Sequence, residues 1–236
     1  MGTLCHIYSQ VLHALMTDGE ILRRIDHTLL KMTASWEEIK ILCDEAVYFN
    51  TASVCIPPCY VKPISGEYGN NPVIATVVGF PLGYSITAAK ILETERAVLS
   101  GASEIDMVIN VCDVKNGRFD FVLEEIKLVK KACGEKLLKV IIETCYLTEN
   151  EKIRLCEIVT EAGADFIKTS TGFGTAGATL ADIELFKKHI GPQVKIKAAG
   201  GIKTREDIEA FINAGAARIG TSSAVKLLAG GVAASY

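Results

Sequence analysis

Three ionisable side chains interrupt apolar runs of the sequence that have the composition of buried strands. They are Lys168 in residues 165–169, Lys197 in residues 194–199 and Asp106 in residues 104–110. Burying such groups is costly, so each needs a reason to be there. A single lysine would be explained by a stem that lies along the core while its ammonium reaches water. Three groups in three runs indicate a site instead.

A lysine beside a second cation is suited to attack a carbonyl carbon and form a Schiff base. The attacking amine must be neutral, whereas a lysine of ordinary pKa, near 10.4, is almost fully protonated at pH 7. A like charge ~5.5 Å away, at an effective dielectric of ~20, disfavours protonation by about 3 kcal/mol, and partial burial adds to this. Asp106 can shuttle the protons that carbinolamine formation, dehydration and enamine formation each move.

Glycines and hydroxyls follow the same strands. Gly172 closes the loop after residues 165–169, Gly200 and Gly201 follow residues 194–199, and Gly220-Thr221-Ser222-Ser223 opens a short helix near the end of the chain. Backbone N–H groups in such loops often hold a phosphate at the carboxyl end of a barrel. The joint placement predicts a phosphorylated substrate.

The elements that carry these residues alternate regularly along the chain. The expected strands are residues 24–29, 51–56, 73–79, 104–110, 137–143, 165–169, 194–199 and 217–220. The expected helices are residues 35–49, a weak one near Tyr60, 86–100, 119–133, 148–162, 179–190, 204–214 and a short one from Ser222. The strands begin about 28 residues apart, which leaves room for one helix in each crossover.

Eight such units in 236 residues favour an α/β fold with a single (β/α)8 TIM barrel over an open, doubly wound sheet. We expect one catalytic domain over residues 1–236, in which residues 1–20 form a helical extension. Apolar residues at helical spacing predict its helix over residues 3–17.

Side chains two apart in a strand share a face. Asp106, Lys168 and Lys197 are therefore expected to meet inside the barrel near its carboxyl end, where barrel enzymes keep their chemistry. By the same alternation, Glu104 and Lys195 should lie deeper in the barrel as structural charge partners.

Residues 172–177 match the glycine pattern Gly-x-Gly-x-x-Gly of dinucleotide-binding proteins. The rest of that motif is missing. The pattern lies in the sixth unit, not the first, and the following strand ends at Lys197-Ala198-Ala199 where an acid should hold the ribose. We therefore expect no dinucleotide here.

Composition excludes several other classes of function. A net charge of −3 with scattered Lys and Arg gives no basic surface for nucleic acid or anionic lipid. The four histidines show no metal-ligand spacing, and the eight cysteines form no Cys-x-x-Cys pair. Apolar runs are too short to cross a membrane, and the start carries no targeting signal. We expect a cytoplasmic protein with reduced thiols and without a metal.

Three segments resemble signature segments of the deoxyribose-phosphate aldolase family, and the resemblance extends over nearly the whole chain. They are residues 166–172, residues 197–202 and residues 104–110; residues 25–30 are similar to the family's first strand. The resemblance implies a class I lyase without metal or other cofactor. It would reversibly cleave 2-deoxy-D-ribose 5-phosphate to D-glyceraldehyde 3-phosphate and acetaldehyde.

The resemblance also implies roles for residues. Lys168 would form the Schiff base, Lys197 would perturb it and assist proton transfer, and Asp106 would give and accept protons. The phosphate would be held by Gly172, Gly200, Gly201, Gly220, Ser222 and Ser223. Some relatives have a basic residue where this chain has Phe173, so Lys203 is a candidate to replace that contact.

Family members are commonly dimers, which makes a homodimer the expected assembly. Two alternatives stay open. One is another Schiff-base aldolase or transaldolase acting on a phosphosugar, and the other is a barrel that only binds phosphosugars.

Overall fold

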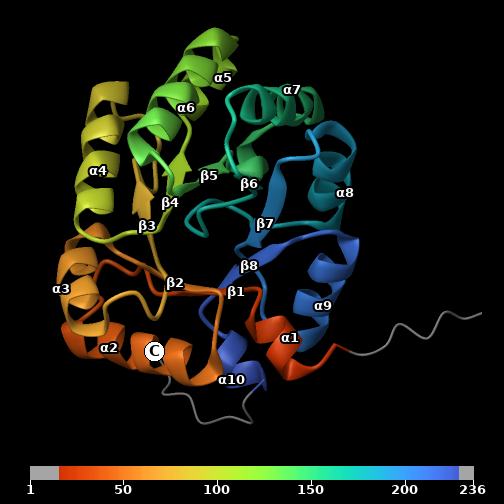
Figure 1. Ribbon diagram of the computed structural model, residues 1–236. Helices are drawn as coiled ribbons and strands as arrows, with labels where there is room; N and C mark the ends of the chain where they lie inside the picture. The colour runs from red at the N-terminus through yellow and green to blue at the C-terminus, as the bar shows by residue number, and fades with distance from the viewer. Residues whose placement is uncertain (1–15, 229–236) are drawn as a thin grey trace, which may run out of the picture.

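Eight parallel strands close into a barrel in the computed structural model, which describes residues 16–228 (Figure 1). The strands are β1 (Ile25–Thr28), β2 (Ser53–Ile56), β3 (Ile74–Val78), β4 (Glu104–Val108), β5 (Leu137–Ile141), β6 (Phe166–Lys168), β7 (Lys195–Ala199) and β8 (Arg218–Thr221). Because β8 pairs with β1, the sheet has no free edge. The predicted TIM barrel is therefore confirmed, and the open sheet is excluded.

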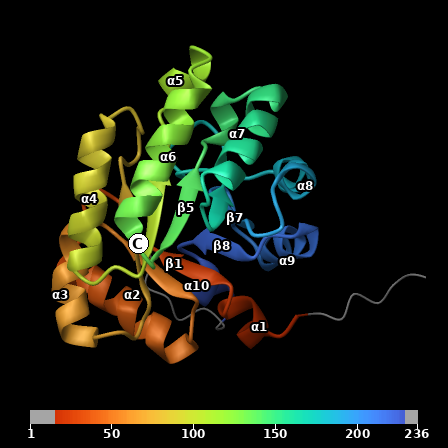
Figure 2. The same cartoon turned by 45° about the horizontal axis from the view of Figure 1, so that its top comes forward.

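Helices surround the barrel on its outside, one or more in each crossover (Figure 2). They are α1 (Asp18–Leu22), α2 (Trp36–Phe49), α3 (Pro58–Tyr68), α4 (Thr87–Leu99), α5 (Val111–Lys115), α6 (Phe119–Cys133), η1 (Thr144–Tyr146), α7 (Glu149–Glu161), α8 (Leu180–His189), α9 (Arg205–Ala214) and α10 (Ala224–Leu228). The two predicted capping boxes form: Ser35 and Thr148 each accept a hydrogen bond from a backbone N–H three residues on, and that residue's glutamate returns one.

The observed helices differ from the expected ones in three places. The segment near Tyr60 is a full helix, α3, although Pro63 lies within it. Burial of Val61 and Ile64 outweighs the hydrogen bond that this proline cannot make. Short α5 and η1 were not predicted. The helix expected over residues 3–17 lies outside the described residues except for Met16 and Thr17, which are not helical: Thr17 is extended and caps α1, which begins at Asp18.

Buried side chains form two separate regions, one between the strands and the helices and one inside the barrel. The outward faces of its strands pack against the helices in one large apolar core. Inside the barrel, β2 and β3 contribute only a small apolar cluster of Cys55, Ala75 and Val77. The other six strands each carry a charged side chain that joins the ion pairs of the interior, so most of the barrel interior is ionic and a smaller part is apolar.

The seven cysteines within residues 16–228 are free thiols. No helix in that part of the chain has the length and apolar character needed to cross a membrane.

Candidate active site

Asp106 brings the two predicted lysines together. Its Oδ2 accepts hydrogen bonds from Lys168 Nζ and from Lys197 Nζ, each at 2.7 Å. The two lysine nitrogens therefore lie within twice that distance of each other. Lys168 and Lys197 are direct register partners on β6 and β7, which explains why neighbouring strands deliver them to one carboxylate.

Four further charged residues join this group, and three of them, Asp26, Lys139 and Arg218, were not predicted as site residues. Lys139 Nζ contacts Asp106 Oδ1 at 2.9 Å and Glu104 Oε2 at 2.6 Å. Lys197 also forms an ion pair with Asp26 Oδ2 at 2.5 Å. Arg218 closes the network by binding Asp26 and Glu104. We call the set the inner ionic cluster: Asp26, Glu104, Asp106, Lys139, Lys168, Lys197 and Arg218.

The signal for the missed residues was available in the sequence. Lys139 interrupts the apolar run of β5 in the same way that Lys168 interrupts β6, and Asp26 does so in β1. Asp106 and Lys139 are register partners. The alternation that predicted a site from three strands would have predicted it from five.

The expected role of Lys195 is wrong, and that of Glu104 needs new partners. Lys195 is exposed, and its Nζ lies 5.8 Å from the centre of the Phe166 ring. It is the first residue of β7, so its long side chain reaches solvent at the amino end of the barrel. Glu104 is buried as expected, but it pairs with Lys139 and Arg218.

Counting charges in the inner ionic cluster identifies the lysine that is most easily neutral. The cluster holds four basic side chains and three carboxylates. All are buried or nearly so, and an unbalanced buried charge is costly. Lys168 contacts a single carboxylate of the cluster, whereas Lys139 and Lys197 each contact two or more. With Lys168 neutral, three cations face three anions.

The pKa directions agree with this count. Burial lowers the pKa of Lys168, and Lys197 lowers it further, against the opposing effect of Asp106. Burial also opposes the charge of Lys197, but Asp106 and Asp26 outweigh it and raise the pKa of that lysine. For Asp106, burial favours the neutral acid, yet Lys139, Lys168 and Lys197 hold its pKa well below the usual value. Burial therefore lowers the pKa of Lys168 more than the charge of Lys197 does, although the sequence-based expectation gave the larger effect to that charge.

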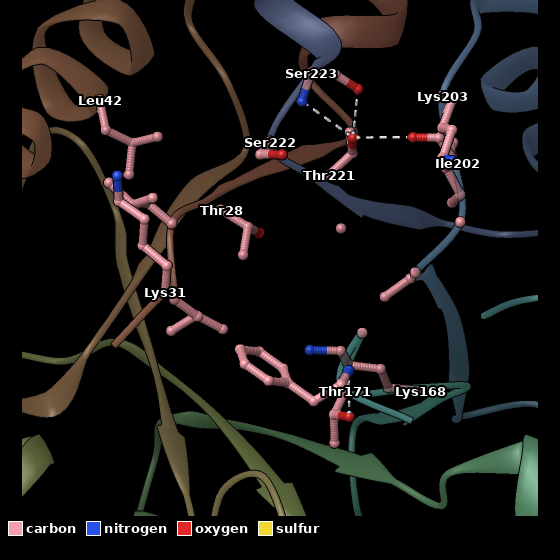
Figure 3. A pocket seen from close by; sticks show the side chains of 18 of the residues that line it. Thr28, Lys31, Leu42, Lys168, Thr171, Ile202, Lys203, Thr221, Ser222 and Ser223 are labelled. Carbon is pink, nitrogen blue, oxygen red and sulfur yellow. Dashed lines mark hydrogen bonds between the residues drawn. The ribbon is translucent and has the colours of Figure 1, made fainter. Parts of the chain in front are cut away.

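A cavity of about 740 Å³ opens above Lys168 at the carboxyl end of the strands. All six predicted phosphate residues line it: Gly172, Gly200, Gly201, Gly220, Ser222 and Ser223. Figure 3 shows Lys168 on one side of the cavity and, on the opposite side, Thr221 at the end of β8 with Ser222 and Ser223 of the loop that follows. The cavity therefore has a reactive amine at one end and a hydroxyl-rich loop at the other.

Residues that line this cavity also have backbone donors without an acceptor. In the part of the chain that the structure describes, the N–H groups of Gly172, Gly201 and Ser222 find no protein acceptor. Gly200 and Gly201 have φ of +81° and +74°, a region that residues with a Cβ rarely adopt. Lys31 and Lys203 line the cavity as well. N–H groups without an acceptor, together with lysines on the same wall, suit a phosphate, although Lys31 also pairs with Glu38 at 2.5 Å.

Two of the three dinucleotide-like glycines, Gly174 and Gly177, have structural roles. A Cβ on Gly177 would lie 2.2 Å from the carbonyl oxygen of Gly200, and one on Gly174 would lie 2.8 Å from Cys145 Sγ. The pattern therefore reflects close packing of loops after β5, β6 and β7. Among residues 16–228, no three His, Cys, Asp or Glu side chains are grouped so as to hold a metal ion; the expectation of a reaction without metal stays a prediction.

Comparison with known proteins gives a consistent result. The model of the family described as DeoC/LacD family aldolase matches residues 21–233. A deoxyribose-phosphate aldolase of Clostridium botulinum is 64% identical over 215 residues, which are 91% of this chain and 97% of the relative. One of Clostridioides difficile is 61% identical over 208 residues, covering 88% and 95% of the two chains.

Solved structures agree. The aldolase QR15 superposes with a TM-score of 0.85 at 40% identity, covering 89% of this chain and 95% of the other. The deoxyribose phosphate aldolase of Aeropyrum pernix, described as a unique tetramer, superposes with a TM-score of 0.82 at 31% identity and covers 90% and 91%.

Proposed function

The chain belongs to the DeoC/LacD family of aldolases, and from this premise we propose how its residues carry out the reaction. The resemblance read from three sequence segments is confirmed. The enzyme is a class I aldolase that cleaves deoxyribose phosphate. For 2-deoxy-D-ribose 5-phosphate, breaking the bond between C2 and C3 gives D-glyceraldehyde 3-phosphate and acetaldehyde, and the reverse reaction joins them.

Lys168 is the Schiff-base residue of this proposal. The observation that carries it is the excess of one base in the inner ionic cluster, together with the lowered pKa of Lys168. Its neutral amine attacks C1 of the open-chain sugar, and the carbinolamine then loses water to give an iminium. As C2–C3 breaks, the C3 hydroxyl loses its proton and the electron pair enters the iminium to form an enamine. Protonation at C2 and hydrolysis release acetaldehyde and restore the amine.

Lys197 and Asp106 move the protons. Lys197 stays protonated because two carboxylates contact it, so it has a proton to give. Asp106 Oδ2 touches both lysines and provides a direct path between them. Because its pKa is low, Asp106 is ionised between steps and carries a proton only while passing it from one group to the other. This refines the expectation that Asp106 itself is both donor and acceptor.

The phosphate end of the substrate faces the loops after β6, β7 and β8. Gly172, Gly201 and Ser222 offer backbone N–H groups, and the hydroxyls of Ser222 and Ser223 add donors. Lys203, which lines the same cavity, supplies the positive charge that Phe173 lacks. The barrel is then the catalytic domain, with the reacting carbon over Lys168 and the phosphate between the loops after β6, β7 and β8.

Borohydride reduction tests the assignment of Lys168. In the presence of deoxyribose 5-phosphate or acetaldehyde, reduction should add a stable mass at Lys168, because only an imine is trapped in this way. Peptide mass spectrometry locates it. Chelators should leave both trapping and turnover intact, since no Lewis acid takes part. Trapping with dihydroxyacetone in preference to acetaldehyde would favour another Schiff-base aldolase, and no trapping would leave a phosphosugar-binding barrel.

Replacing Ser223 by glutamate tests the phosphate site. The new carboxylate repels the phosphate and removes a donor, so KM for deoxyribose 5-phosphate should rise by roughly a hundredfold. Unphosphorylated deoxyribose lacks the repelled group, and its kcat/KM should change little. Steady-state kinetics on both sugars give the comparison, with Ser223→Ala as the neutral control. Equal losses for the two sugars would show that the β8 loop does not bind phosphate.

Assembly and location remain proposals. A homodimer is the state that the family resemblance predicts, whereas the Aeropyrum pernix relative is described as a tetramer. A cytoplasmic location is supported by the free cysteines of the described residues.

A further inference from the structure

Glu143 is a buried carboxylate that the mechanism does not use. It lies two residues after the end of β5, is 4% exposed, and has φ 55° and ψ 67°, the left-handed region. In residues 16–228, Asn50 is the other residue with a Cβ and a positive φ. Residues with a Cβ disfavour this region and keep it only where surrounding contacts over-determine it. Such positions gather at functional sites.

The contacts of Glu143 lead to the loop after β6. Its two carboxylate oxygens accept from the backbone N–H of Thr171 at 3.2 and 3.3 Å, and one of them accepts from the Thr171 hydroxyl. Because that hydroxyl donates to Glu143, its lone pairs remain free to accept from the N–H of Phe173 at 3.0 Å. One carboxylate thus orients three consecutive residues, 171–173.

The surrounding backbone keeps Glu143 in register with the reactive strand. The N–H of Ile142 donates to the carbonyl of Lys168 at 3.1 Å, and the N–H of Thr144 donates to that of Thr169 at 3.0 Å. Glu143 is the residue between these two bonds. Its side chain therefore reaches over the loop that begins immediately after Lys168.

This loop forms part of the cavity wall. Thr171, Gly172 and Phe173 all line the cavity, and the N–H of Gly172 finds no acceptor among the described residues. A Cβ on Gly200 would lie 3.5 Å from the Cα of Gly172, so the β6 and β7 loops meet here. Phe173 packs edge-to-face on Phe80, with 5.3 Å between the ring centres. Moving residues 171–173 would move both a phosphate donor and an aromatic wall.

Direct participation of Glu143 in catalysis does not fit its position. It does not line the cavity, and both oxygens are engaged by Thr171. Lys168 is held separately by Asp106. Loss of the Glu143 contacts should therefore disturb the phosphate end before it disturbs the amine.

We propose that Glu143 is a positioning residue that fixes residues 171–173 so that the N–H of Gly172 points at the substrate phosphate. The inference rests on the proposed function, because it assigns the Gly172 loop to the phosphate end. It predicts that Glu143 and Thr171 act as one unit in phosphate recognition.

Two substitutions break the same contact in different ways. Glu143→Gln keeps the size of the side chain but turns an N–H2 group towards donors, whereas Thr171→Val keeps the shape and removes the hydroxyl. Each should raise KM for deoxyribose 5-phosphate at least about tenfold, while kcat/KM for unphosphorylated deoxyribose changes less than about twofold. Thr171→Ser, which retains the hydroxyl, should behave like the wild type. The double variant Glu143→Gln/Thr171→Val should lose no more than the worse single variant.

Titration with inorganic phosphate gives a measurement that needs no turnover. Calorimetry should show weaker binding in both single variants than in the wild type and in Thr171→Ser. Equal losses for both sugars, additive losses in the double variant, or unchanged phosphate affinity would overturn the positioning role. A wild type that binds phosphate in a Glu143-dependent manner but does not cleave deoxyribose 5-phosphate would support the positioning role and contradict the proposed function.

Discussion

Replacing Lys168 by methionine should lower kcat for deoxyribose 5-phosphate cleavage by at least about four powers of ten, because no other amine of the site can form the covalent intermediate. Lys139 and Lys197 each contact two or more carboxylates and stay protonated. Their pKa values are both raised, whereas that of Lys168 is lowered. Neither can therefore replace it as a nucleophile.

The same substitution should not weaken folding. A lysine whose pKa is lower in the folded than in the unfolded chain reduces stability at pH values below about 10.4. Removing Lys168 also leaves three cations and three carboxylates in the inner ionic cluster. Chemical denaturation at pH 7 should give an unfolding free energy equal to or above that of the wild type. Lys195→Met, at the exposed lysine of β7, is the matched control and should retain full activity. Substantial turnover by Lys168→Met would remove the Schiff-base assignment.

Replacing Lys139 by methionine should have the opposite profile, a loss of about 3–5 kcal/mol in the free energy of unfolding. Lys139 is fully buried, and its Nζ lies 2.6 Å from Glu104, 2.9 Å from Asp106 and 3.5 Å from Asp26. Methionine fills similar space but leaves three buried carboxylates with two cations and the reactive lysine. Burial opposes the charge of Lys139, yet these carboxylates raise its pKa well above the usual value.

The pH dependence follows from that direction. A raised pKa means that the folded chain binds the proton more tightly, so the stabilisation is fully present below about pH 10.4 and is lost as pH rises through the folded value. Urea denaturation at pH 7 measures the effect. Lys127→Met is the control, because Lys127 pairs with Glu161 on the surface and should cost at most about 1 kcal/mol. A Lys139→Met protein as stable as that control would show that the inner ionic cluster does not need Lys139.

Local sequence signals were sufficient for the barrel. Each strand is a short run with at least one Val or Ile, most helices carry a cap or a glycine stop, and the repeat length leaves room for one crossover helix. The exception, α3, shows the limit of local signals, because Pro63 reads as a helix breaker until the burial of Val61 and Ile64 is known.

The sequence also determined which of the predicted residues would meet. Alternation along a strand places Asp106, Lys168 and Lys197 inside the barrel, and the hydrogen bonds to Asp106 show that they converge there. It could not determine which carboxylate each lysine contacts. Lys195 and Lys197 share a face, yet one is exposed and the other fully buried, since depth along the barrel axis depends on strand tilt and register.

Two features were decided only by the tertiary structure. The excess of one base over the carboxylates depends on Asp26, Lys139 and Arg218, which come from three strands far apart in sequence and meet only when β8 closes on β1. The contact between Glu143 and Thr171 joins residues 28 positions apart across the loops after β5 and β6. Both arise from barrel closure, which brings the carboxyl ends of all eight strands to one face. The residue pattern along a single strand does not indicate which side chains of other strands will lie within contact distance.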